Sequence, residues 1–183
     1  MKKILLVLLI LFIAGGSAFA FDVMSFPPPV KAGNIMLDVG VGLMSVAYTG
    51  AKWTIPPLFA QVEYALPVEL PISVGAMFTI SRYEYKWTGI YGSTWSWMDM
   101  TIAGRANWHW GFDINWLDFY TGLSAGYTIS NFESSVQSHV GLDNSGVFFS
   151  GQLGAHFYFK NNIGAMVEFG YPYWLKAGVA LKL

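Results

Sequence analysis

The chain has 183 residues, of which 54% are hydrophobic, 17% are aromatic and only 11% are charged. A soluble domain carries about a quarter charged residues, so this composition argues against one. The formal net charge of −1 gives no reason to expect a nucleic-acid partner, and the absence of cysteine excludes disulfide bonds.

Residues 1–20 have the pattern of a secretory signal peptide. Lys2 and Lys3 provide a positive start, an apolar run extends from Ile4 to Ile13, and Ala18-Phe19-Ala20 forms a small-x-small cleavage site. We expect cleavage after Ala20, which exports the chain and takes its formal net charge from −1 to −3. An uncleaved anchor is the alternative, but the apolar run is short for a helical span, which needs about 20 residues.

Residues 21–33 contain Pro27-Pro28-Pro29 and predict an extended, periplasmic lead-in, because proline cannot donate a ladder hydrogen bond. From Asn34 to the C terminus the hydrophobic pattern has a period of two, which is the period of a β-strand. The alternating segments predict eight strands, at residues 34–44, 58–66, 72–81, 98–110, 117–129, 147–159, 163–171 and 174–183. The longer segments 49–57, 86–96 and 131–145 are predicted as loops, and the shorter connections as turns.

The last segment separates its lysines from its aliphatic residues completely, with Lys176 and Lys182 on one face of a strand. Lys176, Gly178, Leu181 and Leu183 match the polar-x-Gly-x-x-apolar-x-apolar signal that ends bacterial outer-membrane β-barrels, with leucine where an aromatic residue is commonest. The chain therefore resembles the small eight-stranded barrels of the OmpA-like and OmpX-like group. That resemblance implies an all-β fold, an eight-stranded antiparallel up-and-down transmembrane β-barrel over residues 34–183, and recognition by the barrel insertion machinery of the outer membrane.

The two faces of the predicted strands differ in polarity. One face is aliphatic and aromatic, as expected for contact with outer-membrane lipid, whereas a soluble barrel would turn that face inward. The opposite face would line the lumen, and its polar residues are Asp38, Glu63, Asp99, Arg105, His109, Asp118, Gln152, His156, Glu168 and Lys176. We interpret them as a network that fills a barrel too narrow for a pore. A proton or ion path, or a hydrolytic site, is the alternative.

Two ion pairs inside the lumen follow from the expected register. Glu63 and Arg105 fall at the same depth, with a glycine on the strand between them. A three-residue turn between the last two strands sets Glu168 opposite Lys176, and it places Trp174 inward.

Tryptophan and tyrosine gather near both ends of the predicted barrel, as in the girdles of transmembrane barrels. A periplasmic N terminus and an even strand count put the long loops outside the cell. The predicted interfacial aromatics are Trp108, Trp110 and Trp116 on the periplasmic side, and Trp53, Trp87, Trp97 and Tyr171 on the outer side. Residues 86–97 are rich in aromatics, which fits binding of a partner or glycan, closure over the barrel mouth, or simple anchoring.

The sequence contains no metal-binding, phosphate-binding or hydrolase motif, and we expect no cofactor. The favoured hypothesis is a monomeric, non-enzymatic integral outer-membrane protein with an envelope-structural or surface-interaction role through its extracellular loops. A binder or conduit for a small hydrophobic molecule is second, because inward glycines leave room for a cavity. A lipid-modifying enzyme is third, because His109 and His156 fall toward the periplasmic end, and not near the outer rim.

Overall fold

The computed structural model describes residues 29–44, 50–87, 93–134, 145–160 and 162–183. The predicted signal peptide and residues 21–28 of the lead-in lie outside the described residues. Within the described ranges, no helix is long and apolar enough to cross a membrane.

Eight antiparallel strands form a closed barrel in which each strand pairs with its neighbours in sequence and β1 pairs with β8. The strands are β1 (Ile35–Met44), β2 (Lys52–Ala65), β3 (Ile72–Trp87), β4 (Ser93–Trp110), β5 (Leu117–Ser134), β6 (Gly146–Lys160), β7 (Ile163–Gly170) and β8 (Leu175–Lys182). Buried and exposed side chains alternate along them, as in β2 from Phe59 to Ala65. The predicted eight-stranded up-and-down barrel is therefore confirmed.

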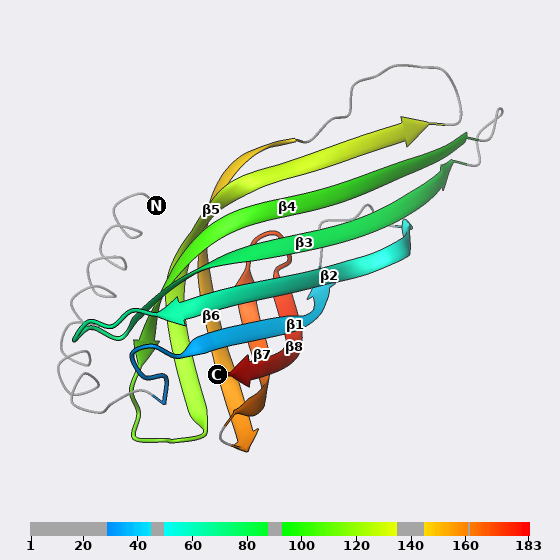
Figure 1. Ribbon diagram of the computed structural model, residues 1–183. Helices are drawn as coiled ribbons and strands as arrows, with labels where there is room; N and C mark the ends of the chain where they lie inside the picture. The colour runs from blue at the N-terminus through cyan, green and yellow to red at the C-terminus, as the bar shows by residue number, and fades with distance from the viewer. Residues whose placement is uncertain (1–28, 45–49, 88–92, 135–144, 161) are drawn as a thin grey trace, which may run out of the picture.

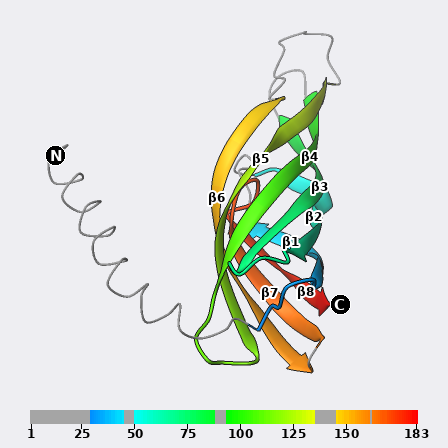
Figure 2. The ribbon, with the colours of Figure 1, turned by 60° about the vertical axis from the view of Figure 1, so that its left-hand side comes forward.

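The wall of the barrel is much taller on one side than on the other. β4 and β5 have 18 residues each, whereas β7 and β8 have 8. At about 3.3 Å per residue, β4 is about 60 Å long and β8 about 26 Å. Figure 1 shows β3, β4 and β5 running well past the ends of β1, β7 and β8, and Figure 2 shows the same rise from another side.

We call the taller part, residues 52–55, 82–87, 93–98 and 131–134, the extension. It rises from the loop end of the barrel, where the turn between β7 and β8 also lies. The opposite end is the termini end, where the Ile35 amide donates to the Leu183 carbonyl oxygen at 3.0 Å.

The extension occupies parts of three segments that were predicted as loops. Those predictions are wrong for residues 52–57, 86–87, 93–96 and 131–134, which continue β2, β3, β4 and β5. Pro56 and Pro57 fit within β2 because the ladder with β3 shifts register there, and because the described pairing with β1 begins only at Leu58. Prolines are tolerated at bulges and at strand edges, where no ladder donor is needed.

The closing hairpin has the predicted register, since Glu168 lies opposite Lys176. The prediction that Trp174 points inward is wrong, because its side chain is 67% exposed. The buried residue of this turn is Tyr173, whose ring lies against Gly42 of β1. The ladder ends at the Glu168–Lys176 pair, so the residues between the strands no longer follow strand alternation.

Candidate functional site

Polar side chains inside the barrel join into a closed ring of hydrogen bonds and ion pairs toward the termini end. Eight residues from β1 to β6 form it, each at most 4% exposed. The consecutive pairs are Asp38–His156 at 3.2 Å, His156–Asp118 at 2.9 Å, Asp118–His109 at 2.9 Å, His109–Ser73 at 2.9 Å, Ser73–Glu63 at 2.6 Å, Glu63–Arg105 at 2.9 Å, Arg105–Gln61 at 2.5 Å and Gln61–Asp38 at 2.8 Å. We call this set the lumen ring.

The two remaining strands join the ring through Arg105. Its Nη2 lies 2.5 Å from Glu168 Oε2 on β7, and Glu168 forms an ion pair with Lys176 on β8. Tyr120 donates a hydrogen bond to Glu168 at 2.7 Å. The predicted ion pair between Glu63 and Arg105 is confirmed, but Arg105 also serves Glu168. Every strand therefore contributes to one connected network, in which buried charges have partners.

Two of the predicted lumen residues lie outside this network. Gln152 accepts from Ser124 at 2.8 Å and donates to Asn107 at 2.7 Å, which makes a separate cluster. Asp99 lies much nearer the loop end, where it accepts from Ser130 at 2.6 Å.

Gln61, Ser73 and Tyr120 are members of the network that the sequence pattern does not single out. Their alternation already placed them on the inward face. Their partners, however, depend on how far each side chain reaches across the lumen. The pairing of Tyr120 on β5 with Glu168 on β7, for example, skips a strand, so no ladder register predicts it.

Three members of the ring stand in the order of a Ser-His-Asp hydrolytic triad, with Ser73 Oγ 2.9 Å from His109 Nε2 and His109 Nδ1 2.9 Å from Asp118 Oδ1. A hydrolase needs a histidine that accepts the serine proton. Here the Ser73 hydroxyl donates to Glu63 at 2.6 Å, so its proton is directed away from His109 Nε2. Ser73 also has no exposed surface. The arrangement is therefore that of a buried network, and not of an accessible nucleophile.

The described residues contain no group of three or more His, Cys, Asp or Glu that could hold a metal ion. Beyond the ring, apolar and aromatic side chains fill the lumen. Phe59, Met77 and Met166 are each at most 4% exposed, and Lys176 Nζ lies 3.4 Å from Met77 Sδ. Rings also occupy the space above inward glycines, since Tyr120 covers Gly154. The room predicted above Gly42 and Gly154 is thus taken by the rings of Tyr173 and Tyr120.

The turn between β7 and β8 folds over the loop end of the lumen. The ring of Tyr171 lies 4.4 Å from that of Phe148, and its hydroxyl lies 3.3 Å from Thr128 Oγ1. Tyr171 is 40% exposed, whereas Tyr173 in the same turn is buried. Tyr171 is therefore inside the mouth, and the prediction that it belongs to a lipid-facing girdle is wrong.

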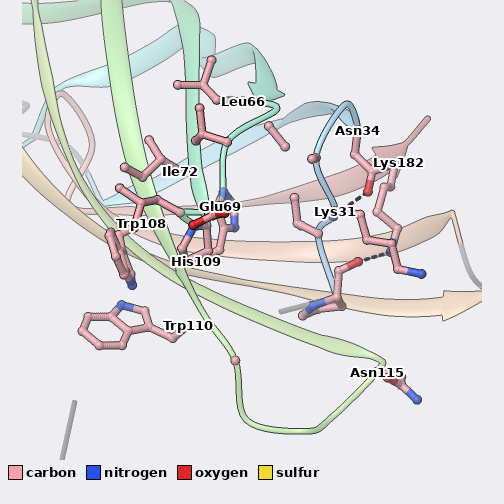
Figure 3. Close-up of a pocket in the computed structure, with 18 of the residues that line it drawn as sticks. Lys31, Asn34, Leu66, Glu69, Ile72, Trp108, His109, Trp110, Asn115 and Lys182 are labelled. Atoms are coloured by element: carbon pink, nitrogen blue, oxygen red, sulfur yellow. Dashed lines mark hydrogen bonds between the residues drawn. The ribbon is translucent and has the colours of Figure 1, made fainter. Parts of the chain in front are cut away.

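The termini end opens into a vestibule of about 910 Å³, lined by the lead-in, the β2–β3 turn, the β4–β5 turn and Lys182. Figure 3 shows Lys31 and Lys182 on one side of it, Trp108 and Trp110 on the other, and His109 of the lumen ring between them. Val30 of the lead-in is buried against Met36 and Ala65. The lead-in thus closes part of this mouth.

The extension reverses the polarity of the barrel wall. Below it, the outward residues of β3 are apolar as far as Ile80. From there they become Arg82, Glu84 and Lys86, and Arg82 Nη2 forms an ion pair with Glu133 Oε2 at 3.2 Å. Charged outward residues mark the upper limit of a hydrocarbon band, because charge on a lipid face is costly.

The inner face of the extension is aromatic. Trp53, Tyr83, Trp97 and Phe132 lie opposite one another across four strands and form what we call the aromatic row. Ring centroids are 5.2 Å apart for Trp53 and Tyr83, 5.2 Å for Tyr83 and Trp97, and 5.0 Å for Trp97 and Phe132. The next pair up the wall is Tyr85 and Trp95, at 6.5 Å.

The aromatic row corrects the prediction of an outer girdle. Trp53 and Trp97 share the inner face with Tyr83, so these two do not face lipid, whereas the side chain of Trp87 lies outside the part of the chain that the structure describes. At the termini end, Trp116 is 55% exposed and stacks on Phe157, and Trp108 shares the outward face with Ile72.

Comparison with known proteins places the fold. The chain is similar to the crystal structure of Ail, the attachment invasion locus protein of Yersinia pestis, in complex with the heparin analogue sucrose octasulfate, with a TM-score of 0.54, 12% identity, and coverage of 84% of this chain and 100% of that chain. It is also similar to the outer membrane protein OprG from Pseudomonas aeruginosa, with a TM-score of 0.50, 11% identity, and coverage of 84% and 97%.

At these identities the likeness establishes the fold. The predicted resemblance to small eight-stranded outer-membrane β-barrels is confirmed at that level. No protein-family model matches the chain, and no curated protein matches it in sequence.

Proposed function

We propose that this protein is a non-enzymatic integral protein of the bacterial outer membrane that acts at the cell surface through its extension. The reversal of polarity at Arg82 is the observation that carries the proposal. Above that level the outer face suits water, and Trp53 and Trp95 on the inner face are partly exposed. The termini end then faces the periplasm, after signal-peptide cleavage at Ala20 and delivery to the insertion machinery, and the barrel is monomeric.

The filled lumen supports a surface role over conduction. The lumen ring, the apolar layer around Phe59 and the turn at Tyr171 occupy three successive levels. Burial of Ser73 and its donation to Glu63 argue against hydrolysis. Ail in its complex with sucrose octasulfate is a precedent for a ligand on a barrel of this fold.

The surface location can be tested by labelling single cysteines, because the chain has none of its own. Lys86→Cys lies in the extension, and Glu69→Cys lies in the exposed β2–β3 turn at the termini end. A membrane-impermeant maleimide applied to intact cells should label only Lys86→Cys. Glu69→Cys should react after the outer membrane is permeabilised. Labelling of Glu69→Cys alone on intact cells would refute the proposed orientation, and labelling of neither before permeabilisation would refute the surface location.

A further inference from the structure

We infer that the vestibule at the termini end is a binding site for a single-chain amphipathic anion, that is, an acyl chain with a carboxylate or phosphate head. The inference stands apart from the proposed function, because its residues lie at the opposite end of the barrel from the extension. Two lysines and an exposed apolar wall carry it. The volume of about 910 Å³ falls within the range of about 300–1,000 Å³ that is usual for small-molecule sites.

Lys31 and Lys182 form the charged part of the vestibule. Lys182 lies at the end of β8, on the inward face that it shares with the buried Ala180, and its Nζ lies 4.2 Å from the centre of the Tyr158 ring. That Nζ donates to the Pro29 carbonyl oxygen at 3.2 Å, which leaves two of its three hydrogens for another acceptor. Figure 3 shows Lys31 of the lead-in on the same side, and the two ammonium charges repel each other.

The described residues provide no carboxylate that forms an ion pair with either lysine. Asp118 attracts Lys182 through the lumen, but two histidines already bind its carboxylate. Glu69 also lines the vestibule, but it is exposed in the β2–β3 turn, and Figure 3 shows it across the space from the two lysines. An anion between the two ammonium groups would relieve their repulsion and gain charge-assisted hydrogen bonds.

The apolar wall of the vestibule comes from the β2–β3 turn. Val68 and Leu70 are 51% and 53% exposed, and Leu66 is partly exposed, so a ligand can reach all three. An acyl chain that lies on them removes apolar surface from water on both partners. Apolar lining with a few polar groups that point to one place is the usual composition of a small-molecule site.

Other ligand classes fit the vestibule less well. A phospholipid of the bilayer lies outside the barrel wall, whereas Lys182 is on the inward face. A purely apolar ligand would cover the ammonium groups without giving them a partner, which is unfavourable. An inorganic anion would leave the apolar wall in water.

The test is calorimetric titration of the protein in nanodiscs of zwitterionic phospholipid, with the heat from empty nanodiscs subtracted. The probes are laurate and dodecyl phosphate below their micellar concentrations, acetate and inorganic phosphate as heads without a chain, and dodecyltrimethylammonium as a chain with the opposite charge. At least one of laurate and dodecyl phosphate should bind, and the difference between them identifies the preferred head. That ligand should bind at least about 30-fold more tightly than its head alone, because the chain covers the apolar wall.

Matched lysine variants locate the binding. Lys182→Gln should weaken it by about tenfold or more, and the more exposed Lys31→Gln by about threefold. Lys160→Gln should bind like the parent protein, because Lys160 is an exposed lysine at the same end of the barrel that does not line the vestibule. Glutamine keeps a donor for the Pro29 carbonyl, and Lys31 is exposed, so both variants should fold, which a heat-shift gel verifies.

Binding of neither laurate nor dodecyl phosphate would overturn the inference. So would binding that neither Lys31→Gln nor Lys182→Gln weakens, because the ligand would then lie elsewhere. Equal binding of dodecyltrimethylammonium would show that charge does not select the ligand. Equal binding of the head without its chain would show that the apolar wall contributes nothing, and either result would also overturn the inference.

Discussion

The strands β3, β4 and β5 cross two environments, and they change the use of their two faces between them. In the part of the wall below the extension, which we call the lower band, polar groups such as Arg105 point inward and apolar side chains such as Ile102 point outward. In the extension, Trp97 points inward and Arg82 outward. The backbone ladder continues without a break across that boundary. Alternation therefore identifies a strand, whereas the solvent on each side decides which face is polar.

The largest expected difference between the two regions is the cost of leaving a charge without its partner. Arg105→Met removes the cation between Glu63 and Glu168, and it should lower the free energy of unfolding by about 3–5 kcal/mol. Arg82→Met in the extension breaks a partly exposed pair and should cost about 0–1 kcal/mol. Urea unfolding of both variants in phospholipid vesicles measures the contrast. Equal losses would show that the lumen pair is no more buried than the surface pair.

A charge placed on the outward face should separate the two regions next most strongly. Ile102 is 62% exposed on the lipid-facing side, so Ile102→Arg should cost about 2–4 kcal/mol, as arginine does at mid-membrane. Asn131→Arg, on the outward face of the extension, should cost about 0–1 kcal/mol. The same vesicle assay applies. A large loss for Asn131→Arg would extend the hydrocarbon band into the extension.

Reversing a whole ion pair should distinguish a shared charge from an isolated one. Glu168→Lys with Lys176→Glu restores opposite signs, but the new lysine faces Arg105. The double variant should therefore remain about 2 kcal/mol less stable than the parent, since residues in one network do not act additively. Among the described residues, Ser96 is the only third side-chain partner of the Arg82–Glu133 pair, so Arg82→Glu with Glu133→Arg should recover fully. Full recovery of the Glu168 and Lys176 double variant would mean that Arg105 does not matter there.

The smallest expected effect on the barrel as a whole comes from the aromatic row. Trp97→Ala should open the extension locally and lower the global free energy of unfolding by less than about 1 kcal/mol. Amide hydrogen exchange in residues 83–86 should accelerate at least about tenfold. Tyr120→Ala, which removes a buried ring from the lumen, should cost about 3–5 kcal/mol globally. A comparable global loss for Trp97→Ala would make the extension part of the barrel's core.

The sequence predicts the lower band well because two simple rules govern it. Period-two alternation of side chains and antiparallel pairing of consecutive strands are enough to expect the Glu63–Arg105 ion pair and the register of Glu168 with Lys176. The structure contains both. The same pattern predicts a loop at residues 86–96, because apolar side chains there occupy the face that is polar lower down. Recognising residues 86–87 and 93–96 as strand requires knowing where the lipid ends.

The lumen ring lies beyond prediction for a different reason. Three of its eight consecutive pairs join strands that are not neighbours, such as Asp38 on β1 and His156 on β6. No pairing rule for adjacent strands specifies such a contact. It depends on the diameter of the closed barrel and on the length of each side chain.

That same contact has a consequence for assembly. A sheet that has added its strands but has not closed keeps β1 away from β6 and β8, so Asp38 lacks His156. Partly inserted intermediates would then carry an unneutralised carboxylate toward hydrocarbon, and their population should be small. We expect the barrel to assemble in one cooperative step, with the meeting of its first and last strands as the event that commits it.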